Sequence, residues 1–151
     1  MIEFREITFE NLGELTELEV ADGQKNFLAD NLHSLAHAYI SITTGCGYAT
    51  PYAIYAGGAM VGFIMYDYQP KDPSYYIWRL MIDKNHQGKG YGRAAIEKLI
   101  AEIKTRPHGP ADCIEVFVVA ENVAAIKLYD SIGFVDTGVV DEGEMLLRLG
   151  I

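Results

Sequence analysis

The feature that most constrains the fold is a glycine-containing stretch, LMIDKNHQGKGYGRAAIEKL, at residues 80–99. Three glycines alternate in it, at Gly88, Gly90 and Gly92. They follow an apolar run typical of a strand and precede a spacing of apolar residues typical of a helix. The first backbone N–H groups of a helix have no intrahelical partners, and glycines let an anion approach them closely. Lys89 and Arg93 add positive charge beside the loop. The stretch therefore predicts a strand–loop–helix unit that binds an anion such as a pyrophosphate.

Two familiar phosphate-binding loops do not fit these residues. A Walker loop requires Ser or Thr after its Gly-Lys pair, but Gly90 follows Gly88-Lys89. A dinucleotide fingerprint has the pattern G-x-G-x-x-G, and here the third glycine, Gly92, comes one residue early. What remains is the pattern Gln87-Gly88-Lys89-Gly90-Tyr91-Gly92.

The rest of the chain predicts strands and helices in mixed order. Strands are expected within residues 1–10, 52–56, 59–68, 74–83, 113–119 and 135–149, the last segment being a hairpin that turns near 141–143. Helices are expected over 11–20, 24–40, 91–104 and 122–133, the last beginning at Asn122 as N-cap and ending at Gly133. In the second helix the expected apolar stripe is Phe27, Leu28, Leu32, Leu35, Ala36 and Tyr39. The order predicts a mixed α/β fold with one central sheet and helices on both faces.

Composition limits the function classes. With 151 residues, half of them hydrophobic, the chain fits one globular domain, 1–151. No apolar run is long enough to span a bilayer, and the charged segment MIEFREITFE does not resemble a secretory signal. Cys46 and Cys113 lack metal-ligand spacing and suggest unpaired thiols in a reducing compartment. We expect a soluble cytoplasmic protein, and a net charge of −9 argues against a nucleic-acid partner.

The glycine loop resembles the Q/R-x-x-G-x-G/A signature of the Gcn5-related N-acetyltransferase (GNAT) family, in which this loop holds the pyrophosphate of acetyl-coenzyme A. ENVAAIKLYDSIGF, residues 121–134, resembles the family's second motif, and together these features cover about residues 75–149. The resemblance implies a mostly antiparallel sheet with a splayed central strand pair, acetyl-CoA as cosubstrate and no metal. The implied coenzyme-binding residues are Leu80, Met81, Ile82, Gln87, Gly88, Lys89, Gly90, Tyr91, Gly92, Arg93, Asn122, Ala125 and Tyr129.

The second motif also suggests a catalytic residue. Asn122, Ala125, Ile126 and Tyr129 share one face of the expected helix. In the family, the asparagine contacts the pantetheine arm and the tyrosine protonates the departing thiolate. The alternative for Tyr129 is a core tyrosine whose hydroxyl is satisfied within the protein.

The sequence offers several candidates for the general base. An alkylamine of pKa about 10.4 is protonated at pH 7, so freeing its lone pair costs about 4.6 kcal/mol. Several family members use a carboxylate on the strand before the loop, but residues 75–79 contain no acid. We rank Glu115 first, because its strand lines the expected gap. The other candidates are Glu19, Asp22, Asp67 and Glu144, and each of the five has an alternative as a surface charge.

The expected acceptor is a small-molecule amine. Residues 21–39 and 61–70 resemble bacterial spermine/spermidine acetyltransferases, which implies a polyamine. Aromatic faces for a cation are offered by Tyr66, Tyr68, Tyr75, Tyr76 and Trp78, although packing explains them equally well. His33 and His37 lack a third ligand and predict ordinary helix histidines. The alternatives are a protein N-terminus or lysine as acceptor, and a non-catalytic coenzyme A-binding sensor. Family members often dimerise, so the resemblance adds a homodimer as an expectation.

Overall fold

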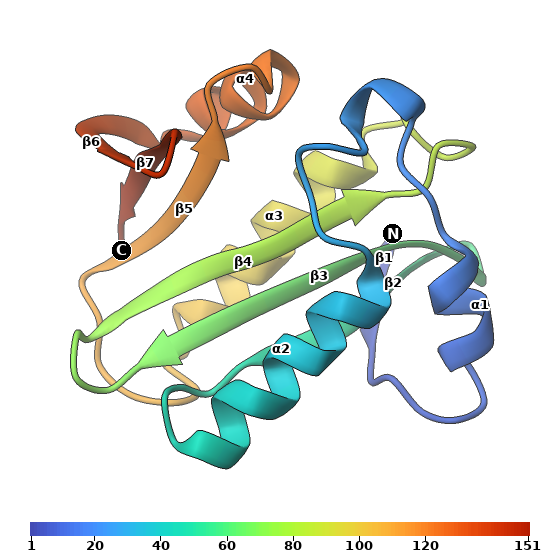
Figure 1. Ribbon diagram of the computed structural model, residues 1–151, viewed down its shortest axis with the longest axis horizontal. Coiled ribbons are helices and arrows are strands. Elements are labelled where there is room, and N and C mark those ends of the chain that lie inside the picture. The colour runs from blue at the N-terminus through green and yellow to red at the C-terminus, as the bar shows by residue number, and fades with distance from the viewer.

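A computed structural model describes residues 1–151, and its strands form one seven-stranded sheet (Figure 1). The strands are β1 (Ile2–Arg5), β2 (Thr50–Ala56), β3 (Ala59–Gln69), β4 (Ser74–Ile82), β5 (Cys113–Val119), β6 (Val135–Asp141) and β7 (Glu144–Gly150). The helices are α1 (Leu12–Glu17), a 3₁₀ turn at Asp22–Gln24, α2 (Asn31–Thr44), α3 (Tyr91–Ile103) and α4 (Val123–Ile132). The predicted order of strands and helices is confirmed.

The sheet runs in the order β1-β2-β3-β4-β5-β7-β6, and every neighbouring pair is antiparallel except β4 and β5. Two predicted hairpin turns are present. Gly57 and Gly58 join β2 to β3 with φ of 58° and 84°. Glu142 and Gly143 join β6 to β7 with φ of 48° and 83°. Paired positive φ values suit the right-handed twist of the flanking strands.

The parallel strands β4 and β5 separate along their length, as Figure 1 shows. Only Tyr75 and Tyr76 of β4 pair with β5, opposite Ile114 and Glu115. Beyond Tyr76 the two strands diverge, so the backbone groups of β4 that face β5 have no strand partner. The predicted splayed central pair is confirmed, and it leaves a gap in the middle of the sheet.

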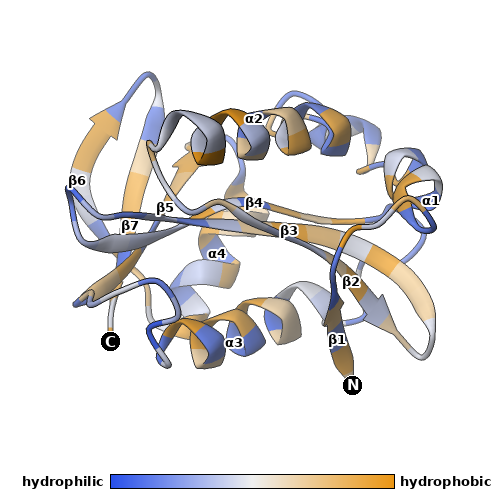
Figure 2. Cartoon of the chain, turned by 90° about the horizontal axis from the view of Figure 1, so that it is seen from below, coloured by the Kyte–Doolittle hydropathy of each residue, from blue (hydrophilic) through white to orange (hydrophobic).

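Helices cover both faces of the sheet. Figure 2 shows α1 and α2 on one side and α3 and α4 on the other. On the α3 side the core includes Ile96, Leu99 and Ile103, and on the α2 side it includes Phe63 and Met65, all almost completely buried. Burial of apolar side chains on both faces is the main force that holds such a layered fold together. Each helix is too short or too polar to serve as a bilayer span.

The predicted apolar stripe of α2 is confirmed only for Leu28 and Leu35, which pack against the core. Leu32 and Tyr39 are 60% and 70% exposed, and the buried residues of the helix are Asn31, Ser34, Ala38 and Ser41. The helix begins at Asn31, with the Asp30 carboxylate accepting from the backbone N–H of His33 at 2.7 Å. Phe27 and Leu28 therefore precede the helix, and the predicted series Leu28, Leu32, Leu35 and Tyr39 runs one residue out of phase with the buried face.

Candidate functional site

A cavity of 490 Å³ occupies the gap between β4 and β5, beside the glycine loop and α4. Its walls include nearly all of the residues that the sequence assigned to coenzyme binding, namely Leu80, Met81, Ile82, Gln87, Gly88, Gly90, Tyr91, Gly92, Arg93, Asn122, Ala125 and Tyr129. Lys89 is the exception. Residues from a strand, a loop and a helix far along the chain thus meet around one space, which we call the first cavity.

The glycine loop presents a run of free backbone donors to the first cavity. None of the N–H groups from Gln87 to Arg93 donates to a protein acceptor. Gly88 and Gly90 have φ of 74° and 80°, a left-handed conformation that favours glycine. The Gln87 side chain fixes the loop, donating from Nε2 to Ile82 O at 2.9 Å and to Gln24 Oε1 at 2.8 Å. Such a row of free donors at a helix N-terminus can bind phosphate oxygens.

The two basic residues of the loop contribute less than the sequence suggested. Lys89 lies outside the cavity walls, with its Nζ 3.4 Å from Asn85 O. Arg93 lines the cavity, but its guanidinium is held by Glu97 at 3.0 Å and by the Ser131 hydroxyl. The anion-binding capacity of the loop therefore rests on its backbone more than on its side-chain charges.

Tyr129 lies on α4 with its ring against the first cavity and is almost completely buried. The Asn122 side chain caps the helix by accepting from the backbone N–H of Ala125 at 3.3 Å, as predicted. The Tyr129 ring packs edge-on against Phe134, but its hydroxyl has no partner in the protein. Burial raises the pKa of Tyr129 above its ordinary value, so the phenol keeps its proton at neutral pH.

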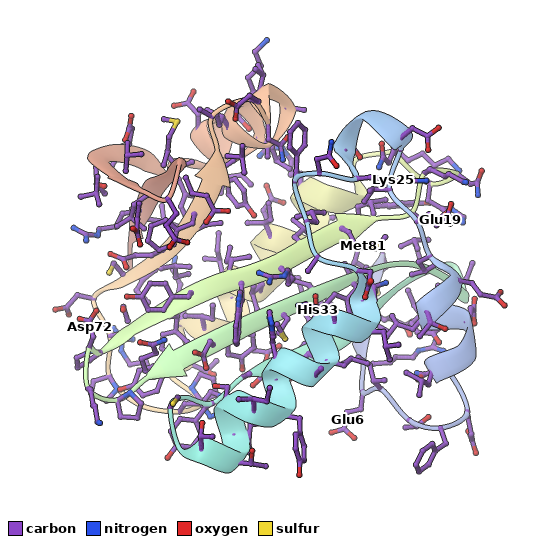
Figure 3. The ribbon with its side chains drawn as sticks, viewed as in Figure 1. Glu6, Glu19, Lys25, His33, Asp72 and Met81 are labelled. Atoms are coloured by element: carbon purple, nitrogen blue, oxygen red, sulfur yellow. The ribbon has the colours of Figure 1, made fainter.

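A second cavity of 750 Å³ opens on the α2 side of β4. It shares Phe27, Leu28, Ile77, Trp78, Arg79, Phe117, Val119 and Glu144 with the first cavity, so the two meet. The junction lies at an irregularity in β4, where the pairing with β3 skips Trp78. In Figure 3, Asp72 at the β3–β4 turn and Met81 mark the two ends of β4 along which the cavities lie. A molecule in each cavity could contact the other at Trp78 and Arg79.

Only some of the predicted aromatic faces line the second cavity. Tyr76 and Trp78 do so, and His37 stacks on Trp78 with ring centroids 5.7 Å apart. Tyr66, Tyr68 and Tyr75 instead pack into the core on the α3 face. Side chains alternate between the faces of a strand, so neighbouring tyrosines in the sequence point to opposite layers. No group of His, Cys, Asp and Glu is placed to hold a metal ion.

The predicted base candidates divide into two groups. Glu19, Asp22 and Glu115 form ion pairs with lysine or arginine side chains at 2.8, 2.9 and 2.5 Å, and none of the three lines either cavity. Figure 3 shows Glu19 at the outer edge of the molecule. Glu115 is buried, but its carboxylate is bonded to Arg148. Asp67 and Glu144 do line the cavities, and Glu144 alone of the five lines both. The geometry therefore favours Glu144 over Glu115 as the general base.

Two charged residues that line the second cavity each have one buried polar atom without a partner. Asp67 is 4% exposed, and its Oδ1 atom has no hydrogen bond. Burial raises the pKa of this carboxyl. The Arg79 Nε atom is also buried without a partner, although the guanidinium donates to Trp78 O at 2.8 Å. Burial lowers the pKa of Arg79, and the charge of Glu144 opposes that shift.

The sequence did not point to the segment between α1 and α2 as part of the first cavity. Val20, Gln24, Phe27 and Leu28 all line it. The available signal was weak: an apolar Phe27-Leu28 pair between polar residues, which is too short to define a helix face. The contact of Gln24 with Gln87 ties this segment to the glycine loop and closes one side of the cavity.

A family model described as the acetyltransferase (GNAT) family matches residues 12–134. A probable spermine N(1)-acetyltransferase of Bacillus subtilis subsp. natto is 28% identical over 97% of this chain and 96% of its own length. A ribosomal protein bS18-alanine N-acetyltransferase of Escherichia coli K12 is 41% identical, over 38% of this chain and 37% of its own length. Among solved structures, the spermidine N-acetyltransferase of Vibrio cholerae, in complex with CoA and spermine, superposes with a TM-score of 0.73 at 19% identity. That match covers 99% of this chain and 94% of the other.

Proposed function

Because the chain belongs to the GNAT family of acetyltransferases, we propose that it transfers the acetyl group of acetyl-CoA to a terminal amine of a polyamine such as spermidine or spermine. The similarity to the Bacillus spermine acetyltransferase over nearly the whole chain supports this acceptor class. So does the second cavity, which combines the carboxylates of Asp67 and Glu144 with the aromatic faces of Tyr76 and Trp78.

The observation that carries the proposal is the junction of the two cavities. A volume of 490 Å³ suits a small-molecule ligand, and the first cavity has the free backbone donors that a pyrophosphate needs. The second cavity has the buried acid that an amine needs. Their shared wall at Trp78 and Arg79 brings a thioester and an amine together. Holding two reactants in contact converts a bimolecular step into an effectively unimolecular one.

In this proposal the coenzyme lies along the open edge of β4. The N–H groups of Gln87–Arg93 bind its pyrophosphate, and the unpaired backbone of Leu80 and Ile82 bonds to its pantetheine arm as a further strand would. The first turn of α4, including Ala125, lines the opposite side of the arm. These contacts place the thioester near the hydroxyl of Tyr129.

The acceptor must reach the thioester as a neutral amine. We assign its proton to Glu144, directly or through water, because this carboxylate lines both cavities. The positive charge of Arg79 at the same junction disfavours an ammonium there and so favours proton loss. Glu144 thus serves as the proton acceptor, while the positive charge of Arg79 lowers the free energy needed to expose the nitrogen lone pair.

Transfer then follows by direct attack. The nitrogen forms a bond to the carbonyl carbon, and unpaired backbone N–H groups of β4 stabilise the oxyanion. The nitrogen of the tetrahedral intermediate then loses its second proton to solvent. As the C–S bond breaks, Tyr129 gives its proton to the sulfur and regains one from solvent. No acyl-enzyme is required, since neither Cys46 nor Cys113 lines either cavity.

The test is thiol release from acetyl-CoA with spermidine, spermine, a lysine peptide and an N-terminal alanine peptide, each against a blank without acceptor. The proposal predicts fast turnover with the polyamines and slow turnover with the peptides. Turnover with peptides alone would contradict the acceptor class. Binding of coenzyme A without turnover on any amine would support a sensor instead.

A further inference from the structure

Asp67 stands apart from the other acids of the molecule. It lies on β3 with 4% of its surface exposed, and its Oδ1 atom has no hydrogen-bond partner. Its one hydrogen bond from another side chain is a long one of 3.4 Å from Gln69 Nε2 to Oδ2, and the backbone N–H groups of Tyr68 and Tyr48 also lie close enough to lower its pKa. By contrast, the buried Glu115 has Arg148 as its ion-pair partner. A carboxylate that is buried without a cation destabilises the protein that carries it.

The surrounding structure accommodates this carboxylate. A Cβ atom at Gly47, in the loop after α2, would come within 2.4 Å of Asp67 Oδ1. Gly47 is therefore needed for the carboxylate to occupy its position. The unpartnered oxygen belongs to a residue that lines the second cavity, near Gln69 and Tyr76. Asp67 thus adds a negative charge to the wall of the second cavity, with its unpartnered oxygen packed beside Gly47.

We propose that Asp67 is the specificity-determining residue that binds the remote ammonium of the polyamine, an inference that rests on the proposed function. Asp67 lies opposite Tyr76 in the sheet, whereas Arg79 lies at the junction of the cavities. The three residues from Tyr76 to Arg79 span about 10 Å along a strand. A triamine as long as spermidine can bridge that distance between reacting nitrogen and remote ammonium, and a short diamine cannot.

The charges along the second cavity also orient the acceptor. Asp67 attracts a cation at one end, whereas at the junction the negative charge of Glu144 is offset by the positive charge of Arg79. The ammonium that stays charged is therefore held at Asp67, while the nitrogen that loses its proton lies beside Arg79 and Glu144. Tyr76 adds an aromatic face near the Asp67 end. Asp67 thus acts in binding and orientation, and the role of base remains with Glu144.

The experiment compares wild type with Asp67→Asn, which keeps the shape of the side chain and removes its charge. Two acceptors are used: spermidine, and 1-aminooctane, which lacks the remote ammonium. For Asp67→Asn we expect the KM of spermidine to rise about tenfold or more, with kcat little changed and the kinetics of 1-aminooctane unaltered. Titration calorimetry of spermidine into the coenzyme A complex should show the same loss of affinity. Asp112→Asn, which removes one exposed carboxylate, is the matched control and should behave as wild type.

Thermal unfolding separates binding from structure. A structural role predicts a lower Tm for Asp67→Asn, whereas a buried carboxylate without a partner predicts an unchanged or higher Tm. Equal loss of turnover on both acceptors, or an unchanged spermidine affinity, would overturn the role of Asp67 while leaving polyamine acetylation intact. If wild type neither binds nor acetylates spermidine, the proposed function fails, and the role of Asp67 fails with it.

Discussion

Two polar regions inside the molecule differ in whether their side chains find hydrogen-bond partners within the protein. On the α3 side, a tyrosine–histidine cluster comprises Tyr52, Tyr66, Tyr68, Tyr75, Glu102 and His108. Its hydroxyls are all engaged: Tyr52 and Tyr66 donate to Glu102 at 2.9 and 3.2 Å, and Tyr75 donates to Gly109 O at 3.0 Å. In the walls of the two cavities, in contrast, Tyr129 and Asp67 have polar atoms without protein partners.

The difference separates residues that stabilise the fold from residues that are available to bind ligands. Buried polar groups in folded proteins are normally hydrogen-bonded, so a cluster of exceptions requires an explanation. In the tyrosine–histidine cluster the bonds close within the protein and stabilise it. In the two cavities the missing partners are those that a coenzyme and an amine would supply. Substitutions in the cluster should therefore change stability, and substitutions at the cavities should change catalysis or binding.

The largest contrast is expected for Tyr129→Phe. The hydroxyl has no partner in the free protein, so its removal should leave Tm nearly unchanged. Loss of the proton donor should lower kcat about a hundredfold, with little effect on the KM of either substrate. Steady-state thiol release with spermidine measures this. A kcat equal to that of wild type would remove Tyr129 from the mechanism.

A second prediction uses two glycines of equal backbone conformation. Gly90, in the loop, and Gly138, in β6, both have φ of 80° and open space where a Cβ would lie. Substitution by alanine should destabilise either protein by about 1 kcal/mol, because an L-residue resists this conformation. Only Gly90→Ala should also weaken coenzyme A binding, by about tenfold, since its methyl group stands among the free N–H donors. Calorimetric titration and thermal unfolding separate the two effects. Equal coenzyme affinity in both variants would mean that the loop is not the anion site.

Tyr66→Phe tests the tyrosine–histidine cluster, where a substitution should change stability and leave activity unchanged. This change removes the hydrogen bond to Glu102 and leaves the buried ring in place. We expect a loss of about 1 kcal/mol in the free energy of unfolding, with kcat and KM unchanged. Urea denaturation and the thiol assay measure the two quantities. A large loss of activity without a loss of stability would show that the cluster takes part in the reaction.

The smallest effect is expected from His108. Burial lowers the pKa of this histidine from 6.5, although the charges of Glu102 and Asp67 oppose the shift. The unfolded chain therefore binds a proton at a higher pH than the folded protein does. Stability from this source is present above pH 6.5 and is lost as the pH falls through the lower pKa of the folded state. Tm measured between pH 7.5 and 5 should fall more steeply in wild type than in His108→Gln, after correction for the constant offset between them. Parallel curves would contradict a lowered pKa for the half-buried His108.

Local patterns explain which parts could be predicted from the sequence. The glycine loop and the α4 motif are each encoded within about a dozen neighbouring residues, so Gly88, Gly90, Asn122 and Tyr129 were found together. The hairpin turn at Gly57-Gly58 is equally local. Strand and helix order followed from such segments.

Tertiary contacts explain what the sequence did not reveal. The buried face of α2 depends on how closely the helix approaches the sheet, and small or polar residues such as Ser34 permit that approach. Glu115 looked suitable because its strand borders the gap, but Arg148, on a strand much later in the chain, holds its carboxylate. The free oxygen of Asp67 could not be seen in the sequence, because it depends on Gly47 and on the absence of a cation nearby.

We infer that the protein groups left without partners are those that contact the ligands. The most direct test is to titrate coenzyme A into the ¹⁵N-labelled protein and follow the backbone amide resonances. The account predicts the largest shifts for Gln87–Arg93, with little change at Tyr66 and His108 of the tyrosine–histidine cluster. Largest shifts in the cluster, or unchanged resonances at Gln87–Arg93 while coenzyme A binds, would contradict it.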